Sequence, residues 1–366
     1  MRVLVVNAGS SSLKLRLLAG DDTVEQTADV EVGPDGWDGS ASAELTRLLD
    51  GWPDPDAVGH RVVHGGTRFT EPVVVDDDVR TALADLTALA PLHQPRSLTG
   101  LDAVTARLPD VPAVACFDTA FHTTIPPAAA TYPVPREWRE RHGVRRYGFH
   151  GLSHGYCARR VAELTGRPDA RVVTCHLGAG ASLAAVVDGR SVDTTMGFTP
   201  LEGLVMATRS GTVDPGLVLW LIEHAGLQPH EVSTALEKRS GLAGLAGSAD
   251  MREVSAAVDR GDADATLALD VYVHRLAAGV AAMAAAAGGL DALAFTGGIG
   301  ERSALVRERA AQHLAFLGVA VDTDRNAAAD GDTEITADGA TVRTLVVAAR
   351  EDLEIARGTR AAIGGG

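Results

Sequence analysis

Residues 3–18 read VLVVNAGSSSLKLRLL, which is an apolar run, a turn of small residues and a second apolar run. This pattern predicts a strand, a tight turn and a second strand. Residues 171–187 repeat the plan as RVVTCHLGAGASLAAVV. In both copies a turn-forming pair follows, Gly20-Asp21 or Asp188-Gly189, and leads into a third extended segment. Two copies of a three-strand unit predict two similar domains.

The residues after each copy alternate between short apolar runs and helical periodicity. We expect strands over residues 57–63, 111–116 and 293–296, and helices over residues 82–89, 153–164, 254–285 and 351–362. Such alternation predicts an α/β fold with mixed sheets flanked by helices. We expect an N-terminal domain of residues 1–120 plus 353–366 and a C-terminal domain of residues 121–352, with the joint in a proline-interrupted stretch.

Composition restricts the partners and the compartment. The chain has 366 residues and a net charge of −15, which disfavours nucleic acid and anionic membranes. Its three cysteines are scattered, so neither disulfides nor a zinc site is indicated, and a reducing cytoplasm is expected. The apolar region 276–295 is interrupted by Gly288-Gly289 and Asp291, which favours a buried helix followed by a strand over a membrane span.

Turns rich in glycine and serine are the first candidates for chemistry. The turns at residues 7–12 and 176–182 can point backbone N–H groups and hydroxyls at a phosphate, although for either turn alone a plain tight hairpin is the favoured interpretation. Because the two turns match, we favour phosphate binding. Lys14 is one of only two lysines and is a candidate phosphate contact or a surface residue. Residues 295–301 (FTGGIGE) form a third glycine turn, which suits nucleotide binding or a plain strand-to-helix connection.

Charged side chains and a histidine outside these turns form the second group of candidates. Arg61 and Arg209 can each bind a carboxylate or phosphate through two parallel hydrogen bonds, or form a surface ion pair. Asp118 follows a strand and can hold an arginine or cap the next segment. His150 lies in a basic and aromatic stretch and is also a candidate core histidine. Glu351 can bind Mg²⁺ or favour the start of a helix.

Taken together, these segments resemble the acetate kinase family of acetate and propionate kinases, within the actin-like sugar kinase superfamily. The resemblance runs collinearly over essentially the whole chain. Its matching segments are residues 5–14, 59–66, 91–93, 117–122, 146–151 and 192–203.

The resemblance implies two duplicated ribonuclease H-like (actin-like ATPase) domains with a cleft between them. It also implies reversible phosphoryl transfer from ATP to acetate, giving acetyl phosphate and ADP, with Mg²⁺ or Mn²⁺ as the metal. A homodimer joined through the second domain is expected. The catalytic residues would be Arg61, Asp118, His150 and Arg209. Asn7 and Glu351 would position the metal. The acyl pocket would be formed by Arg61, Val63, Leu92, Phe149 and Pro200. The nucleotide and its phosphates would contact Ser10, Ser12, Lys14, His176, Leu177, Gly178, Ala179, Gly180, Asp250, Met251, Arg252, Gly298, Ile299, Gly300, Glu301 and Arg302.

Several positions depart from the family pattern, most of them on the nucleotide side. Ala179 and Arg302 stand where the family has Asn, as does Arg350, and Ala207 and Thr212 replace Gly and Asp around Arg209. The chain has only two asparagines, Asn7 and Asn326, so general avoidance of Asn explains part of this drift. Three alternatives stay open: another short acid such as propionate or butyrate as substrate, pyrophosphate in place of ATP, and a nucleotide-binding regulator that has lost turnover.

Overall fold

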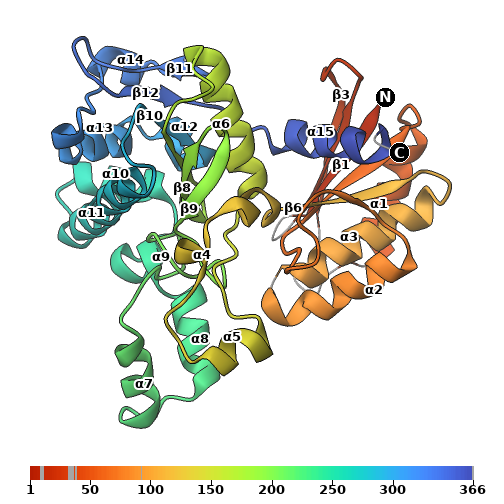
Figure 1. Ribbon diagram of the computed structural model, residues 1–366, viewed down its shortest axis with the longest axis horizontal. Coiled ribbons are helices and arrows are strands. Elements are labelled where there is room, and N and C mark those ends of the chain that lie inside the picture. Colours follow the sequence, from red (N-terminus) through yellow and green to blue (C-terminus); the bar gives the residue numbers. More distant parts are fainter. Residues whose placement is uncertain (9–11, 32–36, 38, 92, 365–366) are drawn as a thin grey trace. The chain divides into compact units, whose positions relative to one another are not determined.

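The computed structural model describes residues 1–8, 12–31, 37, 39–91 and 93–364 (Figure 1). These residues form two compact units. Unit 1 comprises residues 1–123, 149–156 and 350–366, and unit 2 comprises residues 124–148 and 157–349. The expected contacts Ser10 and Leu92 lie outside the described residues.

Unit 1 is built on a six-stranded mixed sheet of order β3-β2-β1-β4-β6-β5. The first three strands form an antiparallel meander, β4 and β6 extend it in parallel with β1, and β5 closes the edge in the antiparallel direction. The strands are β1 (Val3–Ala8), β2 (Ser12–Leu18), β3 (Val24–Glu31), β4 (Ala57–Val62), β5 (Val73–Val74) and β6 (Ala113–Phe117). Its helices and 3-10 turns are α1 (Gly39–Asp50), α2 (Asp77–Asp85), η1 (Leu86–Leu89), α3 (Gln94–Arg107), η2 (Ala120–Thr124) and α15 (Glu351–Gly364).

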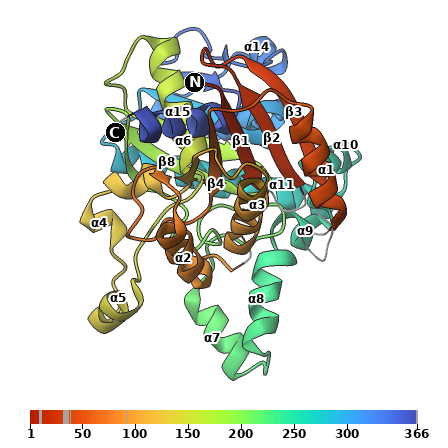
Figure 2. The same cartoon turned by 90° about the vertical axis from the view of Figure 1, so that its right-hand side faces the viewer.

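Alternating apolar side chains give this sheet two buried faces. Leu4, Val6 and Leu15 face a core completed by helices α1 and α3. Figure 2 shows these two helices beside β1 and β2. Val3 and Val5 face the opposite core, which is closed by α15 through residues such as Ile355. The central parallel strands are therefore covered on both sides, and their carboxyl ends are where polar side chains can gather.

Unit 2 repeats this topology with the order β11-β12-β10-β7-β8-β9. Strands β7, β8 and β9 form the meander, β10 and β12 run parallel to β7, and β11 is an antiparallel edge strand. The strands are β7 (Val172–Leu177), β8 (Ala181–Val187), β9 (Arg190–Thr194), β10 (Ala292–Thr296), β11 (Thr333–Glu334) and β12 (Arg343–Val346). The predicted duplication and the mixed-sheet fold class are thus confirmed.

The remaining helices belong mainly to unit 2, with α6 beginning in unit 1 and ending in unit 2. They are α4 (Pro127–Ala130), α5 (Arg136–His142), α6 (Gly151–Thr165), α7 (Pro215–Glu223), α8 (Pro229–Lys238), α9 (Gly241–Ala246), α10 (Met251–Asp259), α11 (Ala263–Ala286), α12 (Gly297–Arg302), α13 (Ala304–His313), η3 (Ala315–Leu317) and α14 (Thr323–Ala327). The predicted helix over residues 254–285 is interrupted at residues 260–262, so α10 and α11 are separate. Over residues 82–89, an α-helix gives way to the 3-10 turn η1.

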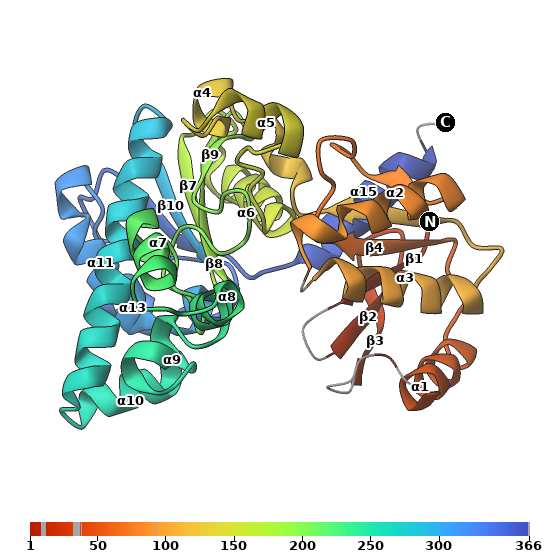
Figure 3. The same ribbon diagram turned by 90° about the horizontal axis from the view of Figure 1, so that it is seen from below.

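Helix α11 is, by length and composition alone, apolar enough to cross a membrane. It packs instead against β8, α9 and α10, and α9 and α10 lie beside it in Figure 3. Tyr272, Leu276 and Val280 are buried on this helix. The chain then enters strand β10. The expected buried helix followed by a strand is confirmed.

The three cysteines lie inside the sheets and helices. Cys116, Cys157 and Cys175 are all free and buried. Burial raises the pKa of each thiol, for Cys116 to about 12. They therefore remain protonated at neutral pH.

Candidate functional site

The strand register of unit 1 brings Asn7, Arg61 and Asp118 to one end of the sheet. Val6 pairs with His60 across β1 and β4, so Asn7 and Arg61 occupy the next positions on adjacent strands. Arg61 pairs with Cys116 across β4 and β6, and Asp118 directly follows β6. These are the carboxyl ends of parallel strands, where ligands of α/β sheets usually bind.

A hydrogen-bonded cluster joins these residues to the start of α15. The Arg61 Nε and Nη2 atoms donate to Asp118 at 3.0 and 2.6 Å, which makes a two-pronged ion pair. Arg61 Nη1 donates to Asn7 Oδ1 at 3.2 Å, and Asn7 Nδ2 donates to Glu351 Oε2 at 2.9 Å. Four segments far apart in the sequence thus place Asn7, Arg61, Asp118 and Glu351 in one cluster.

Burial sets the electrostatics of this cluster. Desolvation opposes the charge on Arg61, but Asp118 and Glu351 outweigh it and hold the guanidinium pKa above its ordinary value. Burial raises the pKa of the Asp118 carboxyl, and the arginine fork acts against that rise. A guanidinium held on one side by a carboxylate is a rigid platform for binding an anion.

Glu351 owes its position to the first turn of α15. Its neighbour Asp352 accepts hydrogen bonds from Arg350 Nε at 3.0 Å and from Arg16 Nη1 at 3.2 Å. Acidic residues at a helix N-terminus are favoured by the helix dipole. Arg350, which departs from the family pattern, therefore serves to anchor the start of the helix that carries Glu351.

His150 belongs to the same unit and has an unusual backbone. Its φ is 56°, in the left-handed region that few residues other than glycine adopt. The next residue, Gly151, donates its N–H to the Asp118 carbonyl at 2.8 Å. A Cβ on Gly151 would lie 2.2 Å from that oxygen, so glycine is required there. The segment that carries His150 is thereby tied to Asp118.

Four other described residues that were predicted to contact the substrate or the phosphates belong to unit 1. Val63 and Phe149 are buried, and the Phe149 ring meets His64 edge to face at 5.5 Å between centroids. Ser12 opens β2, and the exposed Lys14 pairs with Asn7 across β1 and β2.

The glycine turns of unit 2 adjoin each other at the ends of β7 and β10. His176 and Leu177 end β7, and Gly178 N–H donates to Gly180 O at 2.9 Å to close the turn that contains Ala179. Gly297, with φ 78°, opens α12 so close to Leu177 that a Cβ would lie 2.9 Å from its carbonyl oxygen.

The residues of the glycine turn at residues 297–302 differ in exposure and in their hydrogen-bond partners. A Cβ on Gly298 would meet no atom within 4 Å, so this residue leaves open space. Ile299 follows it within α12, and Gly300 packs near β7. Glu301 accepts the Ala349 N–H at 3.0 Å, whereas the Arg302 side chain is exposed.

A buried arginine that the sequence analysis did not identify supports this turn. Arg307 is 1% exposed and donates to the carbonyl oxygens of Gly300 and Glu301 at 2.9 and 2.8 Å. Its Nε donates to Asn326 Oδ1 at 2.7 Å, and burial lowers its pKa to about 10. The presence of Asn326 in a chain with only two asparagines was the available signal.

The third predicted nucleotide segment opens α10. Asp250 caps the helix by accepting the Arg252 N–H at 2.8 Å, and the two side chains form an ion pair. Met251 is buried. Asp250 and Arg252 therefore already bind each other, and Met251 contributes to the core.

Arg209 is held differently from Arg61. Its Nη1 donates to the Pro200 carbonyl oxygen at 2.7 Å. Burial lowers the pKa of the guanidinium, with Glu237 acting in the opposite direction. The Ala207 N–H donates to Ala179 O at 3.1 Å, so the segment before Arg209 contacts the first glycine turn of unit 2.

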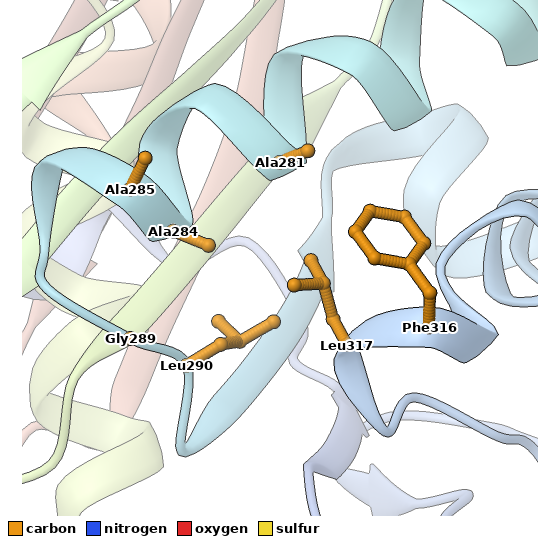
Figure 4. Close-up of a pocket in the computed structure, with 7 residues that line it drawn as sticks. All are labelled: Ala281, Ala284, Ala285, Gly289, Leu290, Phe316 and Leu317. Carbon is orange, nitrogen blue, oxygen red and sulfur yellow. The ribbon is translucent and has the colours of Figure 1, made fainter.

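A separate cavity of about 450 Å³ lies at the end of α11 (Figure 4). Its walls are apolar and come from α11, the loop before β10 and η3; the lining residues are Ala281, Ala284, Ala285, Gly289, Leu290, Phe316 and Leu317. No predicted site residue lines it. The cavity offers no group for catalysis.

Residues 47–357 match the model of the acetokinase family. The chain belongs to this family. The acetate kinase of Clavibacter sepedonicus is 46% identical over 99% of both chains. That of Nostoc punctiforme is 49% identical over 85% of this chain and 78% of its own length.

Solved structures agree with the family assignment. The acetate kinase of Porphyromonas gingivalis superposes with a TM-score of 0.90 at 37% identity, covering 99% of each chain. A propionate kinase from Francisella tularensis gives 0.92 at 37% identity, covering 98% of this chain and 99% of its own. The predicted resemblance is confirmed, and the chain is an enzyme of the acetokinase family.

Proposed function

We propose that this enzyme transfers the terminal phosphoryl group of ATP to acetate and runs the reverse reaction from acetyl phosphate and ADP. The observation that carries the proposal is the cluster of Asn7, Arg61, Asp118 and Glu351, assembled from distant segments in a chain of the acetokinase family. Arg61 and Arg209 would bind the carboxylate and the transferred phosphoryl group, and His150 would donate a hydrogen bond to that group.

The chemistry needs no base to activate the acceptor. A carboxyl group has a pKa of roughly 4 to 5, so acetate is already ionised at neutral pH. The obstacle is repulsion between two anions, which guanidinium groups offset as charge spreads over the phosphoryl oxygens. Asp118 is therefore assigned to orienting Arg61, consistent with its two-pronged ion pair.

The donor atoms of the cluster suit a magnesium ion. Mg²⁺ prefers oxygen ligands and is commonly held by one or two carboxylates together with substrate phosphates. Glu351 supplies a carboxylate, and Asn7 orients it through the 2.9 Å hydrogen bond. When bound, the ion would neutralise charge on the phosphates. Among the described residues, no group of three or more His, Cys, Asp or Glu side chains gathers for a metal, so we assign the ion to the nucleotide-bound form.

We assign the acyl group to Val63, Phe149, Pro200 and Leu92, and the nucleotide to the glycine turns of unit 2. Apolar pocket residues discriminate weakly between acids, because one methylene shifts selection by only about 1 to 3 kcal/mol. A propionate kinase is among the similar solved structures. Propionate is therefore the competing acid in any test.

We further propose a homodimer in the cytoplasm. Helix α7 buries none of its residues, and Leu217, Leu219 and Trp220 are 44%, 56% and 55% exposed. Figures 1 and 2 show α7 and α8 projecting from the strands of unit 2. An apolar helix on the surface favours a second copy as its partner. Replacing Trp220 with Glu should halve the molar mass measured by light scattering.

Three free, buried thiols fit a reducing compartment.

The test of the activity is a trap for acyl phosphate. Purified enzyme with Mg²⁺, ATP and acetate, propionate or butyrate should form a hydroxamate on addition of hydroxylamine, with acetate the best acid. Arg61→Ala and Arg209→Ala should lose the product. Product formed from pyrophosphate but not from ATP would revise the donor. ATP binding without product from any acid would favour a regulator and contradict the proposal.

A further inference from the structure

The loop after β9, residues 195–203, is held by three side chains that the mechanism above does not use. Arg146 donates from Nη1 to the carbonyl oxygens of Thr195 and Met196, both at 3.1 Å. Its Nη2 donates to Glu202 Oε1 at 2.7 Å. The Tyr132 hydroxyl donates to the other oxygen of Glu202 and accepts the Phe198 N–H at 3.0 Å. Both ends of the loop are therefore fixed.

The packing of the loop leaves little freedom. A Cβ on Gly197 would collide with the side chains of Glu202 and Tyr132, so the loop closes tightly over both. The Arg146 guanidinium also lies over the Tyr132 ring, 5.5 Å from its centroid. Burial raises the pKa of Tyr132, which keeps its hydroxyl protonated as a donor.

Arg209 depends on this loop. Its guanidinium makes a hydrogen bond to the Pro200 carbonyl, in the middle of the loop. Within the described part of the chain, no carboxylate forms an ion pair with Arg209, in contrast to Arg61. The direction of its side chain is therefore set by a backbone oxygen, and that oxygen is placed by the loop.

We propose that Tyr132, Arg146 and Glu202 are positioning residues that fix the Pro200 carbonyl and, through it, aim the Arg209 guanidinium at the transferred phosphoryl group. This inference rests on the proposed function, because it assigns Arg209 to the phosphoryl group. The physical reason is geometric: a displacement of about 1 Å in a catalytic group can reduce the rate ~10²-fold.

The test is a double-mutant cycle. Tyr132→Phe keeps the ring and removes the hydroxyl, and Glu202→Gln keeps the shape and removes the charge. Each should lower kcat by ~10- to 100-fold, with affinity for ATP, measured directly by calorimetry, within about twofold of the parent. In an Arg209→Ala background the same changes should lower kcat no further.

Tyr147→Phe is the matched control. It removes a tyrosine hydroxyl of the same unit that donates to Gly143 O at 2.9 Å. The substitution keeps the contacts that Tyr147 makes with the loop, which are the N–H bond to Gly197 O at 3.0 Å and the ring beside Phe198. We expect it to leave kcat unchanged. Equal losses of kcat for Tyr132→Phe in both backgrounds, or a loss matched by Tyr147→Phe, would overturn the inference.

A second measurement does not depend on turnover. The Nε–H resonance of Arg209, identified by its disappearance in Arg209→Ala, should broaden or shift in Tyr132→Phe and stay unchanged in Tyr147→Phe. If the enzyme makes no acyl phosphate yet this resonance responds as expected, the proposed function fails and the positioning role stands. An unaltered resonance in Tyr132→Phe rejects the positioning role, whatever the activity.

Discussion

The two arginines assigned to catalysis are held in opposite ways. Arg61 of unit 1 forms a two-pronged ion pair with Asp118, and its pKa is raised. Arg209 of unit 2 binds a backbone carbonyl, and burial lowers its pKa. The positive charge of Arg61 is largely balanced by Asp118, whereas among the described residues no carboxylate forms an ion pair with Arg209, and the effect of Glu237 is outweighed by burial.

Because of this difference, we expect the two arginines to contribute differently to the stability of the fold and to catalysis. A buried charge pair destabilises the fold strongly when one partner is removed, because the other is left uncompensated. An arginine that awaits an anion contributes little to folding and much to the charged transition state. We therefore expect Arg61 to matter for both, and Arg209 mainly for rate.

The largest expected effect comes from Arg209→Ala. Loss of an arginine that stabilises the transferred phosphoryl group should lower kcat by ~10³- to 10⁵-fold. Arg209→Lys should recover only part of this, because an ammonium cannot reproduce the planar fork. Steady-state rates of acyl phosphate formation and urea unfolding give the two readouts. If Arg209→Ala destabilised the protein more than Arg61→Ala does, the contrast between the arginines would be wrong.

Asp118→Asn removes the carboxylate that balances the charge of Arg61. The substitution leaves Arg61 without its carboxylate in a buried setting, which costs about 3 to 5 kcal/mol in the free energy of unfolding. Urea titration followed by circular dichroism measures the loss. A double variant, Arg61→Met with Asp118→Leu, should regain much of the stability while remaining inactive. Stability of Asp118→Asn equal to that of the parent would contradict the expectation.

A third expectation concerns acid and the core of unit 1. Neither ring nitrogen of His60 has a hydrogen-bond partner in the described part of the chain, and burial lowers its pKa from 6.5 to about 3. Between these two pH values the His60 ring is therefore protonated in the unfolded chain and neutral in the folded one. The free energy of unfolding should fall as the pH drops from about 6.5 toward 3, by about 1.4 kcal/mol per pH unit for this group.

His64 adds to the same slope, since burial lowers its pKa to about 4. Urea midpoints at pH 7.5 and 5.0 should therefore differ less in His60→Leu than in the parent. An identical difference in both proteins would show that His60 ionises as freely when folded as when unfolded.

The smallest expected effect lies on the nucleotide side of unit 2. Restoring the family's amide with Ala179→Asn adds one neutral hydrogen bond, worth about 0.5 to 1.5 kcal/mol. ATP affinity should rise by up to about tenfold, with the KM for acetate unchanged. Calorimetric titration of ATP into both proteins decides the question. Weaker binding by the variant would mean that the alanine suits this turn.

Much of the fold could be predicted because the duplicated meander is encoded by local patterns. Two apolar runs around a small-residue turn, and their repeat at residues 171–187, required no knowledge of distant contacts. The cluster around Arg61 was accessible for a related reason. Asn7 and Asp118 each follow an apolar run and Arg61 lies near the end of another, at residues 57–63, and parallel strands bring such ends together.

The supports of the site were not predictable in this way. Arg307 and Asn326 lie on helices, and apart from the rarity of asparagine in this chain no local pattern shows that they face inward. Tyr132 and Glu202 are separated by 70 residues and meet only in the folded chain. Their roles come from tertiary packing, which a single sequence does not encode in any local pattern.

The burial of all three thiols has a practical consequence. Protonated and inaccessible sulfur atoms react slowly with alkylating reagents and maleimide dyes. A cysteine introduced at an exposed position would thus be labelled selectively in the otherwise native chain. A donor dye on unit 1 and an acceptor on unit 2 would then report, by energy transfer, how their separation responds to acetate, to nucleotide and to both.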